Sequence, residues 1–248
     1  MLILLPPSEG KAVGRRGRPM DLAALSLPGL TEARTRVIDA LTVVSARDDA
    51  LTVLKVGASL ADDVAANTRL LTAPALRARE LYTGVLYDAL DLKSLSAADS
   101  RRATGRLLVI SALYGALRPN DRVSPYRLAM DVDLPDVGPL ARFWAPRLAE
   151  LLPAQVGSGV VVDCRSASYR TAWKPTPQLA ERWVNVDVPG ASHWAKHTRG
   201  LVARRLCQTD VVRRPADLPE ALGDAFAVEL VLPERPGKPW TALVTARP

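Results

Sequence analysis

Residues 107–127 read LLVISALYGALRPNDRVSPYR, and this stretch decides the expected fold. The apolar run 107–110 predicts a buried strand, and polar side chains follow where that strand ends. In open α/β sheets, ligands usually bind at the ends of strands. Gly115 permits a tight backbone turn, and Pro119 and Pro125 stiffen the loop. The sequence therefore predicts a rigid, ligand-facing loop at the end of a buried strand.

Four side chains of this loop are candidate site residues, and we expect them to project from it: Tyr114, Arg118, Tyr126 and Arg127. Their phenol and guanidinium groups are suited to binding an anionic ligand. A structural alternative remains open, because loop arginines often pair with nearby acids. The acids available for such pairing are Asp121, Asp131 and Asp133.

Strand and helix signals alternate along the chain, which predicts a mixed α/β fold. Apolar runs predict strands at 1–5, 107–111, 160–164, 183–188, 225–232 and 240–245. Helical spacing and helix-start residues predict helices at 31–45, from Ser59, within 75–90, from Ser96, from 139 to 151 and at 192–207. No low-complexity linker or internal repeat divides the chain, so we expect a single domain over residues 1–248. The strand order does not follow from the sequence.

Composition limits the class of protein. The 248 residues are 48% hydrophobic, which is enough for a substantial core. No apolar run approaches the roughly 20 residues of a membrane span, and residues 1–6 lack a basic leader and cleavage site. Cys164 and Cys207 lie far apart with no C-x-x-C spacing. We therefore expect a cytoplasmic protein with free thiols and no membrane association.

The chain is strongly basic, with a formal net charge of +7 and a pI near 9.8. Such a balance favours a polyanionic partner. Most of its 33 cations are arginine, a bias that genome composition also produces. Charge therefore supports nucleic-acid binding only where the cations cluster.

The loop after the first predicted strand contains Ser8, Glu9, Gly10 and Lys11. It resembles a phosphate-binding loop but lacks the G-x-x-x-x-G-K-[ST] spacing, which argues against a nucleotide hydrolase. Glu9 and Lys11 are still candidates to line a pocket beside the strand end. Lysine shifts its pKa when buried and arginine does not, so a lysine among many arginines suggests proton transfer or nucleophilic chemistry. With Tyr114 and Lys174, these two are the catalytic candidates.

Two further segments carry candidate DNA- or substrate-binding residues. One follows the predicted strand 160–164 and interleaves aromatic rings with cations; the other is the predicted helix 192–207, where Lys196 and Arg199 share a face. The candidates are Arg165, Ser166, Tyr169, Lys174, Lys196 and Arg199. Interleaved rings and cations suit stacking on bases and contact with phosphates. They suit a structural cation–π stack equally well, and Trp194 is expected to pack on the other side of the helix.

His193 and His197 lie four residues apart, on one predicted helix face. The H-E-x-x-H motif is absent, and no third ligand suggests itself, so we interpret them as surface or packing histidines. A G-x-S-x-G nucleophile elbow is also absent. We predict no metal site and no cofactor.

Taken together and in this order, several segments resemble the YaaA family, known as peroxide stress proteins. The matching segments are 1–4 with Pro7 and Lys11, LYTG at 81–84, LYGALRPND at 113–121, PYRL at 125–128, Phe143-Trp144, 160–162 with Ser168-Tyr169, and AKHTRG at 195–200. They cover nearly the whole chain. One departure is the first loop, where Ser8-Glu9-Gly10 enlarges a shorter Pro-Ala-Lys type of sequence.

The resemblance implies a single mixed α/β domain with a positively charged cleft and a helix-hairpin-helix-like element, as in DNA-repair proteins. In this chain that element would fall near residues 82–104, which carry Lys93, Arg101 and Arg102. The family is linked to DNA binding and to limiting damage from iron and peroxide.

Two functional hypotheses follow. In the first, a cytoplasmic protein of the oxidative-stress response binds DNA through the basic cleft, with little sequence specificity and a preference for duplex or distorted duplex. In the second, the same cleft is the active site of an enzyme that acts on a small anionic or nucleobase-like substrate. Both hypotheses require the candidate residues to meet on one concave surface.

Overall fold

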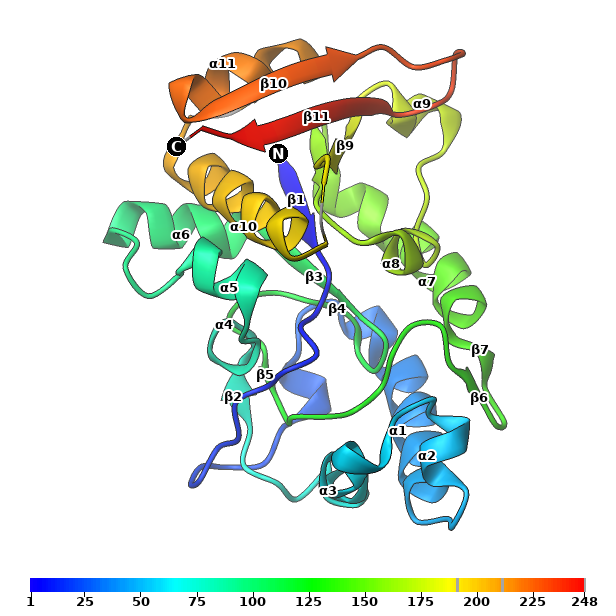
Figure 1. The fold of residues 1–248 in the computed structure, drawn as a ribbon. Helices are drawn as coiled ribbons and strands as arrows, with labels where there is room; N and C mark the ends of the chain where they lie inside the picture. The colour runs from blue at the N-terminus through cyan, green and yellow to red at the C-terminus, as the bar shows by residue number, and fades with distance from the viewer. Residues whose placement is uncertain (191, 211, 248) are drawn as a thin grey trace.

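A mostly parallel sheet forms the centre of the computed structural model, which describes residues 1–190, 192–210 and 212–247. Its order is β10-β11-β9-β8-β1-β3-β4 (Figure 1). The strands are β1 (Leu2–Leu5), β3 (Leu107–Ser111), β4 (Gly115–Leu117), β8 (Val161–Asp163), β9 (Trp183–Asp187), β10 (Phe226–Val231) and β11 (Trp240–Ala246). Strands β3, β1, β8, β9 and β11 are parallel, whereas β4 and β10 are antiparallel to their neighbours at the two edges.

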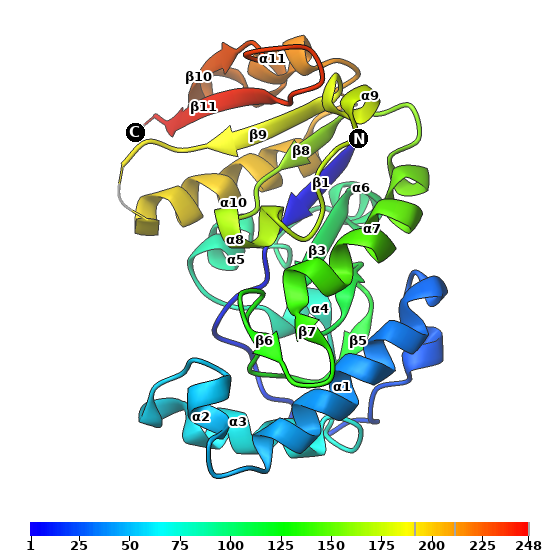
Figure 2. The ribbon, with the colours of Figure 1, turned by 90° about the vertical axis from the view of Figure 1, so that its right-hand side faces the viewer.

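The three central strands are continuously apolar because both faces of the sheet are covered. Every residue of β1, β3 and β8 is buried. Figure 2 shows α7 (Leu140–Val156) on one face and α10 (Ser192–Gln208) on the other. Because both faces of β3 are buried, residues 107–110 (LLVI) are all apolar instead of alternating between apolar and polar.

The remaining elements surround this sheet. Helices α1 (Thr31–Ser45), α2 (Ala50–Val53) and α3 (Ala61–Ala66) lie at the end of the molecule far from β10 and β11 (Figures 1 and 2). The shorter helices are α4 (Ala78–Leu81), α5 (Val85–Leu90), α6 (Ala97–Arg106), α8 (Ala167–Arg170), α9 (Pro177–Ala180) and α11 (Leu218–Leu222). Two small ribbons pair β2 (Leu76–Arg77) with β5 (Arg122–Val123) and β6 (Asp133–Leu134) with β7 (Gly138–Pro139). Within the described ranges, no helix has the length and apolar character needed to cross a membrane.

The structure confirms most of the predicted elements. Helix α1 and strand β3 have the predicted bounds, and the predicted cap of α6 is present, since the Ser96 side chain accepts a hydrogen bond from the Asp99 amide at 3.1 Å. The helix start predicted at Ser59 is wrong. Ser59 lies inside a 3₁₀ turn, Ala58–Leu60, and α3 begins after it without a side-chain cap.

Helices α5 and α6 occupy the region in which the resemblance implies a helix-hairpin-helix-like element. They are joined by residues 91–96, with Asp91 in a left-handed conformation at the end of α5. Helix α5 packs tightly on α10, because a Cβ added to Gly200 would lie 2.2 Å from the Leu86 carbonyl oxygen. A pair of helices is therefore present at this place, and its contact with DNA stays a prediction.

Candidate functional site

The site lies where the direction of strand connection reverses. After β1 the chain leads to β3 on one side of it, and it later returns to form β8 on the other side. The loops that leave β1 and β8 therefore diverge, which opens a crevice at the carboxyl ends of these strands. A cavity of about 730 Å³ occupies this place, a volume typical of small-molecule sites.

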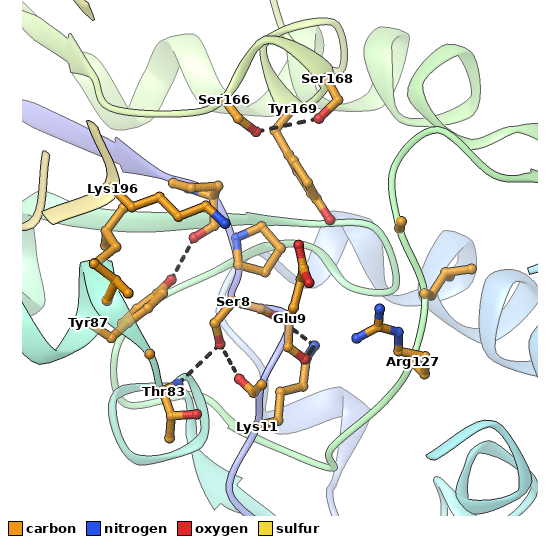
Figure 3. Close-up of a pocket in the computed structure, with 18 of the residues that line it drawn as sticks. Ser8, Glu9, Lys11, Thr83, Tyr87, Arg127, Ser166, Ser168, Tyr169 and Lys196 are labelled. Atoms are coloured by element: carbon orange, nitrogen blue, oxygen red, sulfur yellow. Dashed lines mark hydrogen bonds between the residues drawn. The ribbon is translucent and has the colours of Figure 1, made fainter. Parts of the chain in front are cut away.

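Six segments line the cavity, and many of their side chains point into it (Figure 3). They are the loop after β1 (6–11), the loop and short helix after β8 (164–169), one face of α10, residues 83–87 and two loops near 54–56 and 127–131. The structure brings together seven of the predicted site residues here: Glu9, Lys11, Arg127, Ser166, Tyr169, Lys196 and Arg199.

Lys11 is held in the cavity wall by a firmly anchored loop. Its backbone bridges to Tyr82, and the amide of the next residue, Ala12, donates to the Leu81 carbonyl at 2.8 Å. The Lys11 Nζ donates to the Ser8 carbonyl at 2.8 Å and lies 4.3 Å from the centre of the Tyr126 ring. No carboxylate of the described residues lies within ion-pairing distance of this amine.

These surroundings lower the pKa of Lys11 from 10.5 to about 7. Burial is the largest cause, and the Arg127 guanidinium adds repulsion, while Asp63 and Glu9 act in the opposite direction. A large part of the Lys11 population therefore carries a neutral, nucleophilic amine at neutral pH.

Arg127 and Lys196 are the other cations available to a ligand. The buried Asn67 clamps the Arg127 backbone from both sides, since its Oδ1 accepts from the Arg127 amide at 2.9 Å and its Nδ2 donates to the Arg127 carbonyl at 3.0 Å. The Arg127 guanidinium and the Lys196 amine make no hydrogen bond or ion pair to any described side chain, and both point toward the centre of the cavity (Figure 3). The Glu9 side chain points into the same space.

Two of the predicted cations serve the fold instead. Arg199 lines the cavity, but its Nε donates to the Val186 carbonyl at 3.1 Å and its guanidinium lies 3.7 Å from Asp187. Arg165 is fully buried and forms a 2.8 Å ion pair with Asp163 at the end of β8. It also lies over the Trp183 ring at 5.7 Å, so the structural cation–π alternative is the correct one for this residue.

The prediction that the loop after β3 displays its polar side chains is largely wrong. Tyr114 is fully buried and its hydroxyl donates to the Ser124 carbonyl at 3.0 Å. Tyr126 is 5% exposed and its hydroxyl lies within hydrogen-bonding distance of Ser111 and Tyr82. Arg118 donates to the Gly105 and Leu107 carbonyls and lies outside the cavity. Only Arg127 is available as predicted, because the other groups satisfy buried polar atoms.

Two further expectations are wrong. Lys174 is exposed and lies outside the lining of the cavity, because the adjacent Trp173 turns inward and packs against Trp183 at 4.8 Å. Trp194 does not pack on the far side of α10 but is 65% exposed between His193 and His197. In the described ranges, no three His, Cys, Asp or Glu side chains are grouped to hold a metal ion.

Sequence reasoning missed several lining residues, among them Lys55, Tyr87, Asp131, Cys164 and Ser168. Cys164 and Ser168 lie just beyond β8, and their place after a buried strand was the available signal. The Cys164 thiol lies in the wall, but burial raises its pKa to about 12. It stays protonated at neutral pH, so it lacks the thiolate that a peroxide-reactive cysteine needs.

Replacement of Lys11 by methionine is expected to stabilise the protein at low pH. Between pH 7 and 10.5 the unfolded chain binds a proton that the folded chain does not, so the free energy of unfolding rises with pH in this window. Below pH 7 Lys11 is charged in both the folded and the unfolded chain, so the folded state carries the full free-energy cost of burying that charge. With an allowance for solvent screening, we expect the variant to be more stable by about 1–3 kcal/mol at pH 6, with the difference vanishing toward pH 10.5.

Urea unfolding of the wild type and the Lys11→Met variant at pH 6 and pH 10 measures this effect. The exposed Lys174→Met variant is the matched control and is expected to show the same difference from wild type at both pH values. A Lys11→Met difference that is independent of pH would contradict the lowered pKa.

Comparison with known proteins places the chain in a family. The family model described as "Peroxide stress protein YaaA" matches residues 1–229. The chain belongs to the YaaA family. It is 48% identical over 251 residues to a "UPF0246 protein" of Streptomyces coelicolor, covering 97% of this chain and 96% of that protein. It is 37% identical over 214 residues to one of Corynebacterium efficiens (83% of this chain, 84% of that protein) and 30% identical over 253 residues to one of Burkholderia lata (92% of each).

Membership of the YaaA family confirms the resemblance carried by the segments LYTG, LYGALRPND and AKHTRG. The structure gives these segments different physical roles. LYGALRPND forms the buried turn from β3 into β4, whereas AKHTRG presents Lys196 to the cavity and uses Gly200 for the close approach to α5. LYGALRPND therefore supports the fold, and AKHTRG contributes Lys196 to the site.

Proposed function

We propose that this protein acts in the response to peroxide stress by binding a phosphate-bearing ligand of nucleotide size in the cavity at the carboxyl ends of β1 and β8. The observation that carries the proposal is the convergence of Lys11, Arg127 and Lys196 on one concave space with no carboxylate partner among the described residues. Unpaired cations in a partly enclosed site favour an anion. The cavity volume is suited to a sugar or nucleoside attached to that anion.

Two groups of the cavity, Glu9 and Lys11, are also suited to chemistry on such a ligand. Glu9 supplies a carboxylate and Lys11 an amine with a pKa near 7, which are the components of acid–base catalysis. An enzyme acting on a small phosphorylated or nucleobase-like substrate is therefore the form of the proposal that the geometry supports best.

Replacement of Arg127 by glutamine is expected to weaken binding of a nucleoside monophosphate by about 10- to 100-fold, because a charge-assisted hydrogen bond contributes about 1.5–3 kcal/mol. Titration calorimetry with AMP, dAMP and ribose 5-phosphate measures the change at low salt. Lys196→Gln is expected to act in the same direction. Lys174→Gln removes an equal charge outside the cavity and is the matched control. Equal affinities for Arg127→Gln and Lys174→Gln would refute the proposed site.

DNA binding is a second candidate, and a separate observation favours it. The loop that continues from Lys11 carries Arg15, Arg16 and Arg18, all exposed. These three cations are part of the excess that gives the chain its formal net charge of +7. In this form of the proposal the phosphate in the cavity belongs to a nucleotide of a distorted duplex, and the loop contacts its backbone, as do Lys93 and Arg101 of the α5–α6 region.

A salt series tests this candidate. If these cations contact phosphates, the logarithm of the association constant for a gapped duplex falls with the logarithm of salt concentration, by about 0.9 per contact. Replacing Arg15, Arg16 and Arg18 together by glutamine is expected to reduce that slope by about 3. A slope near zero in the wild type would exclude DNA as the partner and leave the small-ligand form standing.

A further inference from the structure

The Lys11 amine lies at the boundary of two cavities. A second hollow, of about 380 Å³, shares Glu9 and Lys11 with the first and is otherwise lined by Val13, Arg69, Tyr126 and their neighbours. Lys11 therefore lines both the hollow that contains Arg127 and Lys196 and the hollow that lies against Tyr126.

The Lys11 amine forms no ion pair with a carboxylate of the described residues. Its hydrogen bonds go to the neutral carbonyls of Ser8 and Glu9, at 2.8 and 3.4 Å, and its remaining close neighbour is the face of the Tyr126 ring. These contacts hold the amine in place, but none of them is a carboxylate that would keep it permanently protonated. A lysine in this setting can lose its proton and attack a carbonyl carbon, as in enzymes that form a Schiff base.

The ligand class follows from the neighbouring charges. Arg127 and Lys196 point into the larger cavity and are free to hold a phosphate, and Lys11 lines the same cavity. A phosphorylated sugar in its open-chain form carries both a phosphate for the two cations and an aldehyde carbon for the amine.

We propose that the Lys11 Nζ forms an imine with the aldehyde carbon of a phosphorylated open-chain sugar whose phosphate is held by Arg127 and Lys196. The inference rests on the phosphate site proposed above. The amine lone pair forms a C–N bond as the C=O π bond breaks, and the resulting carbinolamine loses its hydroxyl as water to give the C=N bond. One amine and one aldehyde give one imine and one water, so no oxidant or reductant is needed. Glu9, whose side chain points into the cavity, is the group to which we assign the proton transfer between nitrogen and the departing oxygen.

Two sources carry this chemistry: a free aldose phosphate, and an abasic deoxyribose within DNA. The experiment therefore has two arms, ribose 5-phosphate and deoxyribose 5-phosphate in one and a duplex oligonucleotide with a single abasic site in the other. Sodium borohydride added to each mixture reduces an imine to a stable secondary amine. Mass spectrometry of the intact protein and of its peptides then detects and locates the adduct.

We expect a borohydride-dependent adduct on the peptide that contains Lys11 in at least one arm. The arm that gives the adduct shows whether the sugar phosphate is free or part of DNA. Lys11→Gln and Lys11→Arg are expected to reduce trapping at least 20-fold, and the arginine variant does so while keeping the positive charge. Lys174→Gln, which removes an exposed lysine outside both cavities, is expected to trap like the wild type. No adduct in either arm, or an adduct that persists in Lys11→Gln, would overturn the proposal.

Calorimetry on the same proteins separates this inference from the function on which it rests. Binding of ribose 5-phosphate that depends on Arg127 but yields no trapped adduct refutes the imine and preserves the phosphate site. If no phosphorylated ligand binds, both proposals fail. Circular dichroism and urea unfolding of the Lys11 variants establish that the loss of trapping is not a loss of fold.

Discussion

Replacement of Arg165 by methionine is expected to lower the free energy of unfolding by about 3–5 kcal/mol, because it leaves the Asp163 carboxylate buried without its main partner. Arg165 is fully buried, and Asp163 is 1% exposed. The guanidinium binds both oxygens of Asp163 at 2.8 Å and also donates to the Tyr169 and Trp173 carbonyls, at 3.0 and 2.8 Å. The nearest remaining cation, Arg170, lies 4.0 Å from Asp163.

The control for this prediction is an exposed ion pair. Arg214 lies 3.0 Å from Asp217, and the arginine side chain is 79% exposed, so Arg214→Met is expected to change stability by less than about 0.5 kcal/mol. The double variant Asp163→Leu, Arg165→Met is expected to recover part of the loss, since it removes the uncompensated charge as well. Urea unfolding measures all three. The interpretation fails if Arg165→Met is as stable as Arg214→Met.

This pair links the fold to the candidate site. Asp163 ends β8, and the Arg165 contacts to Tyr169 and Trp173 fix the short helix α8 that presents Ser166, Ser168 and Tyr169 to the cavity. A variant that weakens the pair is therefore expected to weaken ligand binding as well, although Arg165 does not line the cavity.

Replacement of Gly115 by alanine is expected to lower the free energy of unfolding by about 2–5 kcal/mol. Two costs add here. The residue has a φ of +71°, which costs an alanine about 1–2 kcal/mol. The new methyl group would also lie 2.6 Å from the ring of Trp144, which is fully buried and tied to the Ala112 carbonyl by a 2.8 Å hydrogen bond, and such overpacking costs about 1–3 kcal/mol more.

Gly138→Ala separates these two costs. Gly138 has a φ of +88°, but its added Cβ would meet no atom within 4 Å, so only the backbone cost applies. We expect chemical denaturation to show a loss at Gly138→Ala that is smaller than the loss at Gly115→Ala by at least 1 kcal/mol. Equal losses would mean that Trp144 moves aside at no cost and that the turn after β3 is not tightly packed.

The fold was predictable where one local rule dominates. Continuous apolar runs identified β3 and β8, the apolar residues within 183–188 identified β9, and regular spacing of Val37, Leu41 and Val44 identified α1. The sheet order was not predictable, because it depends on which buried strands meet across long separations. The start of α3 was mispredicted because Ser59 fits a helix cap and a 3₁₀ turn equally well.

The candidate site was predictable only in part, because the same side chains serve burial and binding. Glu9, Lys11, Arg127 and Lys196 reach the cavity as expected. Tyr114 and Tyr126 do not, since a phenol at a strand end satisfies an inward partner as readily as it meets a ligand. Asp163 and Arg165, two residues apart, contained a signal for pairing, but the sequence does not show whether the arginine turns inward. The inward orientation of Arg165 depends on the Trp173 carbonyl and the Trp183 ring, which only the folded chain brings next to it.

The position of β1 has a consequence for biosynthesis. Ile3 pairs with Leu107 on one side and Leu2 with Val161 on the other, so β1 is synthesised well before both of its neighbours and cannot be enclosed until they have been made. Until β8 has been translated, one edge of the apolar segment Leu2–Leu5 is unpaired and can pair with another chain. Such long-range closure slows folding, and we expect nascent chains of this protein to depend on chaperones until most of the polypeptide has emerged.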